Sequence, residues 1–395
     1  MTVKLRVRRV LRGGVSLALA AAALWAAAMA APLGSLGEAA RSLDGGALAL
    51  ALLRFERGDV FADDALSLPA VMALRTAPLL FAAHDELTAA WESEPTAPPP
   101  DGDAPPAEPP AEPAPAPSAE PAEPLPIVVR DNGVPSATLR PSDPAGYLVY
   151  GNVYVHNTSA APLTADDLGF DFSAVLTDDA PQVLILHTHG CEAYTMPAGE
   201  EYEESDDHRT LDEAYNVLRV GDEIARTLES AGVGVLHDRT LHDYPNYSGS
   251  YNRSLATIER YRAGYPSLVY ILDVHRDAVS DASGRQYKLL CAEEPNAAQL
   301  EFVVGSDGGG LTHDRWRENL KLACAVQSTL LEEYPTLLRP IVVRNSRYNQ
   351  QATVGSLLLE VGTAGNSLEE ALVSARLFAE GFAKTIRQEK SQPAG

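Results

Sequence analysis

The chain has 395 residues, of which 45% are hydrophobic and 22% charged, so it can bury a sizeable core and is not disordered throughout. Its formal net charge of −23 argues against binding to nucleic acid and against broad contact with an anionic membrane. The cysteines Cys191, Cys291 and Cys324 are too few for a disulfide framework.

A basic segment followed by an apolar run opens the chain. Lys4–Arg12 is rich in Arg, and the run from Gly14 to about Leu36 is rich in Ala, Leu and Val. About 20 apolar residues cross a bilayer as a helix whose basic end stays cytoplasmic. We therefore predict a single-pass anchor within residues 1–36 and an exported remainder. The alternative is a cleaved signal peptide, because Ala28-Met29-Ala30 resembles a cleavage site.

Two segments of biased composition follow the predicted anchor. Residues 37–94 form an Ala- and Leu-rich juxtamembrane region, and residues 95–126 consist largely of Pro, Ala and Glu. Proline favours extended polyproline II and like charges repel, so the second segment predicts a semi-rigid, disordered linker. At about 3.1 Å per residue it reaches on the order of 100 Å when fully extended.

Residues 127–180 contain two β-rich runs around Gly151-Asn152, which predict a hairpin in a β-rich N-terminal extension of the domain that follows. From residue 181 to 390, apolar strands alternate with amphipathic helices. The predicted strands are Val183–Leu186, Val233–Leu236, Leu268–Val274, Ile341–Val343 and Leu357–Leu359, and the predicted helices are Asp212–Ser230, Ser250–Tyr261, Asp314–Glu333 and Ser367–Gln388. This pattern predicts a three-layer α/β fold, with a mostly parallel sheet and helices on both faces.

Polar residues follow three of the predicted strands, and in open α/β sheets ligands bind beyond the carboxyl ends of strands. His189 and Glu192 form an H-x-x-E pair after the first strand, and His275 ends another. Two His and one carboxylate with an open fourth position form a catalytic zinc arrangement, which activates water. Glu360 follows a third apolar strand and can act as the general base.

Several neighbouring residues have two interpretations each. Arg276 can hold a substrate carboxylate through paired hydrogen bonds or form a salt bridge with an adjacent Asp. Asn216 and Arg219 lie about one helical turn apart and either face the cleft or lie on the helix surface. His187 shares the strand face of His189, where it either orients a ligand or is buried. The loop from residue 237 to 251 is a candidate substrate-binding rim.

Six motifs, in this order, closely resemble the stage II sporulation protein P family from about Gly146 to the last predicted helix. They are His187–Tyr194, Tyr215–Asp222, His237–Pro245, Gly249–Ser254, Asp273–Ala278 and Glu360–Asn366. The resemblance implies a membrane-anchored, zinc-dependent N-acetylmuramoyl-L-alanine amidase with endopeptidase activity, acting on peptidoglycan between the mother-cell and forespore membranes during engulfment. It also implies an amidase-like fold and two partners, stage II sporulation protein D and stage II sporulation protein M.

The resemblance matches His189 and His275 to the two histidine ligands of the zinc ion. It leaves two sources for the third ligand. Glu192 has the H-x-x-E spacing of zinc carboxypeptidases, whereas the broader amidase family draws its carboxylate from just before the first helix, where Asp212 and Glu213 lie.

Glu360 matches the catalytic glutamate near the C-terminus of amidases. Two other classes of function stay open. A wall-binding scaffold would keep the fold and tether without the chemistry, and a zinc carboxypeptidase would need a carboxylate-binding Arg such as Arg276. Sequence spacing does not decide which amide bond is cut.

Overall fold

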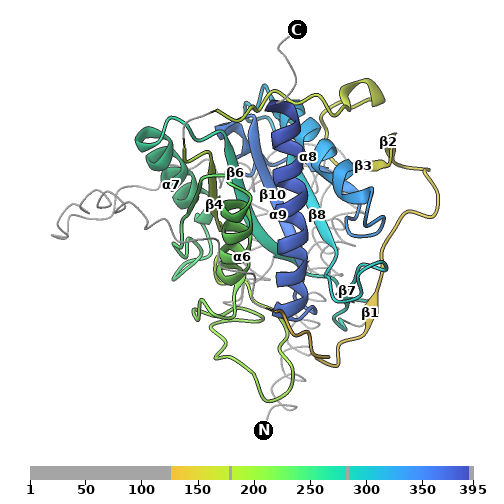
Figure 1. Cartoon of the computed structure of the whole chain (residues 1–395), viewed down its shortest axis with the longest axis vertical. Helices are drawn as coiled ribbons and strands as arrows, with labels where there is room; N and C mark the ends of the chain where they lie inside the picture. The colour runs from red at the N-terminus through yellow and green to blue at the C-terminus, as the bar shows by residue number, and fades with distance from the viewer. Residues whose placement is uncertain (1–125, 178–179, 282–283, 391–395) are drawn as a thin grey trace, which may run out of the picture. The chain divides into compact units, whose positions relative to one another are not determined.

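The computed structural model describes residues 126–177, 180–281 and 284–390, which form an α/β domain (Figure 1). The predicted anchor and juxtamembrane region, and all but the last residue of the predicted linker, lie outside the described residues. Among the residues that the structure describes, none of the helices has both the length and the apolar character needed to cross a membrane.

An eight-stranded sheet runs through the domain in the order β2-β3-β9-β8-β10-β6-β4-β5. Its strands are β2 (Leu148–Tyr150), β3 (Val153–Asn157), β4 (Val183–Leu186), β5 (Val235–His237), β6 (Tyr270–Asp277), β8 (Leu300–Gly305), β9 (Ile341–Arg344) and β10 (Gly355–Thr363). Five of the seven neighbour pairings are parallel, which confirms a mostly parallel sheet. The pairs β2–β3 and β8–β10 are antiparallel.

The predicted hairpin is present, because β2 and β3 pair in antiparallel register around Gly151-Asn152. It is part of the main sheet, since Val155 of β3 pairs with Ile341 of β9. A separate two-stranded sheet joins β1 (Ser136–Ala137) to β7 (Lys288–Leu289). The segment 126–157 is therefore built into the same domain at two places.

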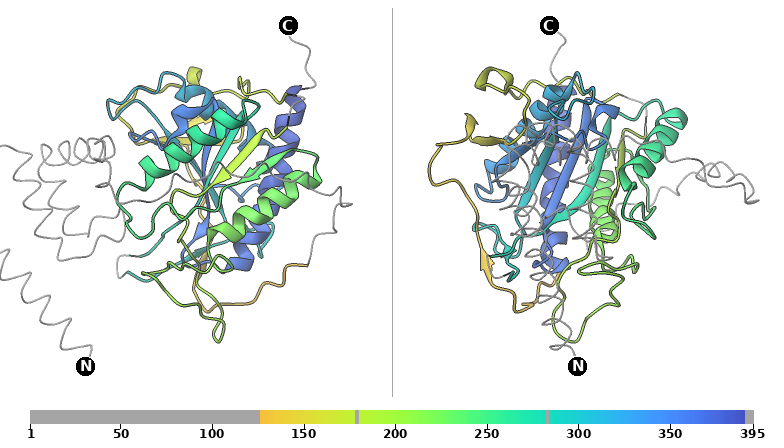
Figure 2. Two further views of the ribbon diagram at one scale, coloured as in Figure 1. Left: turned by 90° about the vertical axis from the view of Figure 1, so that its left-hand side faces the viewer. Right: turned by 180° about the vertical axis from the view of Figure 1, so that it is seen from behind.

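Helices cover both faces of the main sheet, as predicted. On one face α9 (Leu368–Lys390) lies between α6 (Val217–Ser230) and α8 (Trp316–Leu331) (Figure 1). On the other face, α7 (Ser250–Gly264) packs Ile258 against Leu184 and Leu186 of β4. The right-hand view of Figure 2, turned by 180° from Figure 1, shows the domain from this side. The three predicted layers are thus confirmed.

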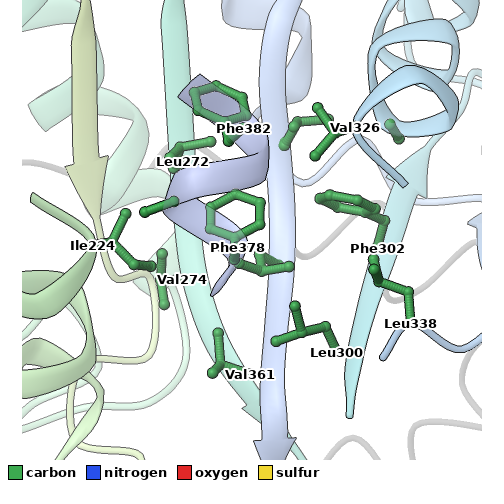
Figure 3. Packing of buried hydrophobic residues seen from close by; sticks show 14 of the residues in the cluster. Ile224, Leu272, Val274, Leu300, Phe302, Val326, Leu338, Val361, Phe378 and Phe382 are labelled. Carbon is green, nitrogen blue, oxygen red and sulfur yellow. The ribbon is translucent and has the colours of Figure 1, made fainter. Parts of the chain in front are cut away.

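The larger core lies between the sheet and the helices α6, α8 and α9. Figure 3 shows Phe378 and Phe382 of α9 against side chains of the sheet. The Phe302 and Phe378 rings have centroids 6.1 Å apart in an edge-to-face arrangement, and Tyr270 meets Phe382 at 5.4 Å. Aromatic pairs in this geometry stabilise a core beyond their buried area.

Helix α6 begins five residues later than predicted, at Val217 instead of Asp212. Asn216 caps it, because its side-chain oxygen accepts a hydrogen bond from the Leu218 N–H at 3.0 Å. The predicted apolar face is confirmed, since Val220, Ile224 and Leu228 are fully buried. The cap, rather than the preceding acidic residues, sets the start.

Candidate metal centre and active site

The carboxyl ends of β4, β6 and β10 meet at one edge of the sheet, because these three neighbours are parallel. Glu360 of β10 lies directly opposite His275 of β6, and Asp273 lies opposite Leu186 of β4. Paired residues in register, and residues two apart in a strand, share one face. Asp273, His275 and Glu360 therefore project from the face that α7 covers in part.

His189, Glu192 and His275 come together beyond these strand ends, and all three are buried. The Oε2 atom of Glu192 lies 3.4 Å from Nδ1 of His275. The rings of His189 and His275 have centroids 5.3 Å apart and are nearly perpendicular. The structure thus places the two predicted histidines and the H-x-x-E glutamate side by side.

These separations can be compared with the geometry of a zinc site. With bonds of about 2.1 Å, two donor atoms on a tetrahedral ion lie about 3.4 Å apart, and two imidazole centroids lie about 5 Å apart. Moreover, the Nδ1 atom of His189 is buried without a hydrogen-bond partner, which is costly unless another group satisfies it. The residues present therefore fit a zinc ion.

The described residues do not include a group of three His, Cys, Asp or Glu side chains already gathered into a metal-binding cluster. Glu192 and His275 form the close pair of this site, and His189 lies beside them. Tyr247 holds His189 in this position, since its ring stacks on His189 with centroids 4.4 Å apart and its hydroxyl lies 3.1 Å from His189 Nε2.

The charge states of the three candidate ligands differ. Burial lowers the pKa of His189 to about 3, so its imidazole is neutral and has a lone pair for a metal. Burial alone would raise the pKa of Glu192, but the hydrogen bond from His275 and the charge of Arg276 hold it well below its usual range. Burial opposes protonation of His275, yet Asp273 and Glu192 raise its pKa well above normal. Zinc binding would therefore release a proton from His275.

Asp273 is an ion-pair partner of His275, a contact that the sequence interpretation missed. Its Oδ1 atom lies 2.9 Å from Nε2 of His275, which leaves Nδ1 toward Glu192. The backbone N–H and the hydroxyl of Thr188 both donate to Asp273, at 2.8 and 2.6 Å. A carboxylate behind a histidine is typical of metal sites. The available signal was the Asp-x-His spacing in one strand.

Glu360 lies in the sheet between His275 of β6 and Glu301 of β8. Its Oε2 atom is buried without a hydrogen-bond partner. Burial raises the pKa of Glu360 well above its usual range; the charge of His275 opposes the shift, and Asp277 and Glu301 add to it. A bound divalent cation would favour the ionised carboxylate. The position beside the candidate ligands is the one that a general base requires.

Three predicted substrate contacts lie in structural positions. Arg276 donates from Nε to the Ala193 carbonyl at 3.1 Å and from Nη2 to the His208 carbonyl at 2.9 Å. Asn216 is fully buried as the α6 cap, and Arg219 lies 4.0 Å from Glu223 on the same helix. A substrate group would have to displace hydrogen bonds to reach Arg276 or Asn216. Their contact with substrate stays a prediction.

The two alternative carboxylate ligands lie in an exposed turn before α6. Asp212 accepts a hydrogen bond from the Ala214 N–H at 3.0 Å, and Glu213 forms an ion pair with Arg239 at 2.7 Å. Glu192, in contrast, contacts His275 directly. The geometry therefore favours Glu192 as the third ligand.

His187 is fully buried, as one of its two interpretations predicted, but contrary to expectation it does not share the surroundings of His189. Its Nδ1 atom lies 2.8 Å from the Val274 carbonyl and its Nε2 atom 2.9 Å from Nε2 of His237. The expectation was wrong because β4 ends at Leu186, so strand alternation does not extend to these residues. From the predicted rim, Tyr247 and Tyr251 both contact His189, with ring centroids 4.4 and 5.6 Å away.

A family model described as Stage II sporulation protein P (SpoIIP) matches residues 150–383. Stage II sporulation protein P of Bacillus subtilis (strain 168) is 30% identical over 225 residues, which cover 53% of this chain and 52% of that protein. The match thus spans about half the length of this curated relative.

Two solved structures are also similar. An N-acetylmuramoyl-L-alanine amidase from Clostridium difficile 630 has a TM-score of 0.33 and 16% identity, covering 55% of this chain and 97% of its own. The CwlD amidase from Clostridioides difficile, in complex with the GerS lipoprotein, has a TM-score of 0.34 and 15% identity, covering 53% and 98%. Similarity at this level carries no argument about activity.

Proposed function

Because the chain belongs to the stage II sporulation protein P family, we propose that it is a peptidoglycan hydrolase that cuts the amide bond between N-acetylmuramic acid and L-alanine. We further propose that His189, Glu192 and His275 hold a zinc ion. The observation that carries this proposal is the contact of Glu192 with His275 at 3.4 Å, beside His189 and in register with Glu360.

The residues of the chain have distinct parts in this reaction. Zinc, when bound, supplies Lewis-acid activation of water near neutral pH. Asp273 keeps the His275 ring in one orientation through the 2.9 Å contact at Nε2. Glu360 accepts a proton from the attacking water at a carboxylate oxygen and transfers it to the nitrogen of the leaving L-alanine. Hydrolysis is then balanced, with a carboxylic acid and a free amine as products.

The wider role is proposed from family membership. We propose that the chain acts during forespore engulfment from the cell membrane, with its catalytic domain outside the cytoplasm, and that it also cuts stem-peptide cross-links. Stage II sporulation protein D and stage II sporulation protein M are the proposed partners. The match over about half of the curated relative supports these proposals for the matched region.

The carboxypeptidase alternative has less support from the geometry. It needs an Arg whose guanidinium is available to a substrate carboxylate near the metal. Two nitrogens of the Arg276 guanidinium already donate to the carbonyls of Ala193 and His208. The scaffold alternative is also weaker, because His189, Glu192 and His275 lie close together and Glu360 is in register with His275.

The proposed activity is tested by incubating purified peptidoglycan with the full chain and measuring release of soluble peptide. We expect release to stop on addition of a zinc chelator and to return when zinc is restored. His275→Ala is the matched control, since it removes a ligand without a chelator. Release that continues in the chelator and in His275→Ala would contradict a zinc-dependent reaction.

A further inference from the structure

Arg209 lies next to Glu192 although seventeen positions separate them in the sequence. A short antiparallel bridge joins Arg209 to Glu192. On either side of it, the Ala193 N–H donates to the His208 carbonyl at 2.9 Å and the Thr210 N–H to the Cys191 carbonyl at 2.8 Å. This pairing carries the Arg209 side chain into the site, where it is only 6% exposed.

The Arg209 guanidinium lies between two buried carboxylates. Its Nη2 atom is 3.7 Å from Oε1 of Glu192, and its Nη1 atom donates to Oδ2 of Asp243 at 2.9 Å. Asp243 is itself held by the Cys191 N–H at 3.2 Å. The two oxygens of Glu192 are thus divided, with Oε1 toward Arg209 and Oε2 toward His275.

The same guanidinium also contacts the ring that covers His189. The Arg209 Cζ atom lies 4.7 Å from the centroid of the Tyr247 ring. That ring is nearly parallel to His189, with an interplanar angle of 7°. A guanidinium attracts an aromatic face, so it stabilises this position of Tyr247. Arg209 therefore acts on Glu192 directly and on His189 through Tyr247.

We propose that Arg209 is a positioning residue of the metal centre, which holds Glu192 and His189 in the orientation that zinc requires. This inference rests on the zinc site of the proposed function. Groups behind the ligands change metal affinity, typically by about 10- to 100-fold, because they hold ligands in place before the ion binds. The Arg209 guanidinium lies over the Tyr247 ring and an ammonium lacks its planar face, so Lys can replace Arg209 only in part.

The test measures the zinc dissociation constant of the full chain by competition with a chromophoric chelator. Arg209→Met keeps the approximate length of the side chain and removes the charge, and we expect it to raise the dissociation constant by about 10- to 100-fold. Arg209→Lys restores the charge but not the planar face, so its dissociation constant should lie between those of wild type and Arg209→Met.

Arg339→Lys is the matched control. Arg339 is as buried as Arg209, with 8% against 7% of the side chain exposed, and it pairs with Asp277 and Glu301 instead of a proposed ligand. We expect Arg339→Lys to leave zinc affinity unchanged even if it lowers the melting temperature. Melting temperatures of the metal-free variants separate a general loss of stability from a specific loss of zinc affinity.

If the wild-type chain and Arg209→Met bind zinc equally well, the proposed role of Arg209 is wrong, but the proposed metal site stands. If Arg209→Met does not fold, unchanged zinc affinity of Arg209→Lys overturns it in the same way. A wild-type chain that binds no zinc would overturn the proposed metal site, and the inference with it. The absorption spectrum of the cobalt-substituted chain gives a second readout, because it should change in the Arg209 variants and not in Arg339→Lys.

Discussion

Glu192 is the residue on which the choice of the third ligand depends. It contacts His275 at 3.4 Å, whereas Asp212 is exposed in the turn before α6. We expect Glu192→Gln to lose most bound zinc, because an amide is a weaker ligand than a carboxylate. Asp212→Asn serves as the control and should retain zinc. Elemental analysis of the two variants decides the matter, and the reverse result would move the ligand to Asp212.

Glu360 is predicted to take part in the chemistry without holding the metal. Glu360→Gln should keep zinc content and fold, because the amide is nearly isosteric. Its rate of hydrolysis should fall by about 10² to 10⁴, the usual contribution of acid–base catalysis. Measuring rate and zinc content together separates this variant from His189→Ala, which should lose both. Full turnover by zinc-loaded Glu360→Gln would show that another group is the base.

The sequence alone could indicate His189, Glu192, His275 and Glu360, because each follows an apolar strand pattern closely. It placed Tyr247 only within a candidate substrate-binding rim, and it did not indicate Arg209. Both come from loops, and their place beside the site depends on the pairing of Arg209 with Glu192 and the stacking of Tyr247 on His189. No local pattern encodes such contacts.

At the scale of single elements, the predictions were best where apolar residues form one continuous strand. The bounds predicted for the first strand, Val183–Leu186, are those of β4. Strand β8 (Leu300–Gly305) was missed, because Glu301 interrupts its apolar pattern and leaves a continuous apolar run of only three residues, Phe302–Val304. Glu301 can occupy the sheet because Arg339 lies 3.4 Å away as an ion-pair partner. The start of α6 was misplaced because the acidic residues before Asn216 resemble a first helical turn.

Helix α9 contains a glycine whose replacement tests its packing against α8. A Cβ atom at Gly381 would lie 2.7 Å from Cγ of Leu330, which is buried. Alanine favours a helix by about 1 kcal/mol over glycine, but overpacking costs about 1 to 3 kcal/mol. We expect Gly381→Ala to lower the free energy of unfolding, as measured by chemical denaturation.

Gly264 in α7 is the matched control, because a Cβ atom there would meet nothing within 4 Å. Gly264→Ala should leave the stability unchanged or raise it slightly. If Gly381→Ala were as stable as Gly264→Ala, the close approach of α8 and α9 at this position would be wrong.

At the scale of the whole molecule, composition and order of elements predicted the three-layer domain, and the structure confirms it. The antiparallel junction between β10 and β8 was not predictable, since local patterns do not encode the direction of a strand that enters a sheet from another part of the chain.

The proposed anchor makes a prediction for the intact chain. If Gly14–Leu36 spans the bilayer, the protein should stay with membranes after a carbonate wash, because a transmembrane helix is inserted effectively irreversibly. Immunoblotting of the pellet and supernatant measures this directly. Release of a mature form that begins near Ala31 would show that the segment is a cleaved signal peptide.

Identification of the bond that is cut tests the central claim most directly. Purified peptidoglycan is digested with the zinc-loaded chain, and the soluble products are analysed by mass spectrometry and by labelling of new amino termini. We predict stem peptides with a free L-alanine amino terminus and glycan strands without peptide, and no such products from Glu360→Gln. Products in which L-alanine stays attached to N-acetylmuramic acid would contradict the account.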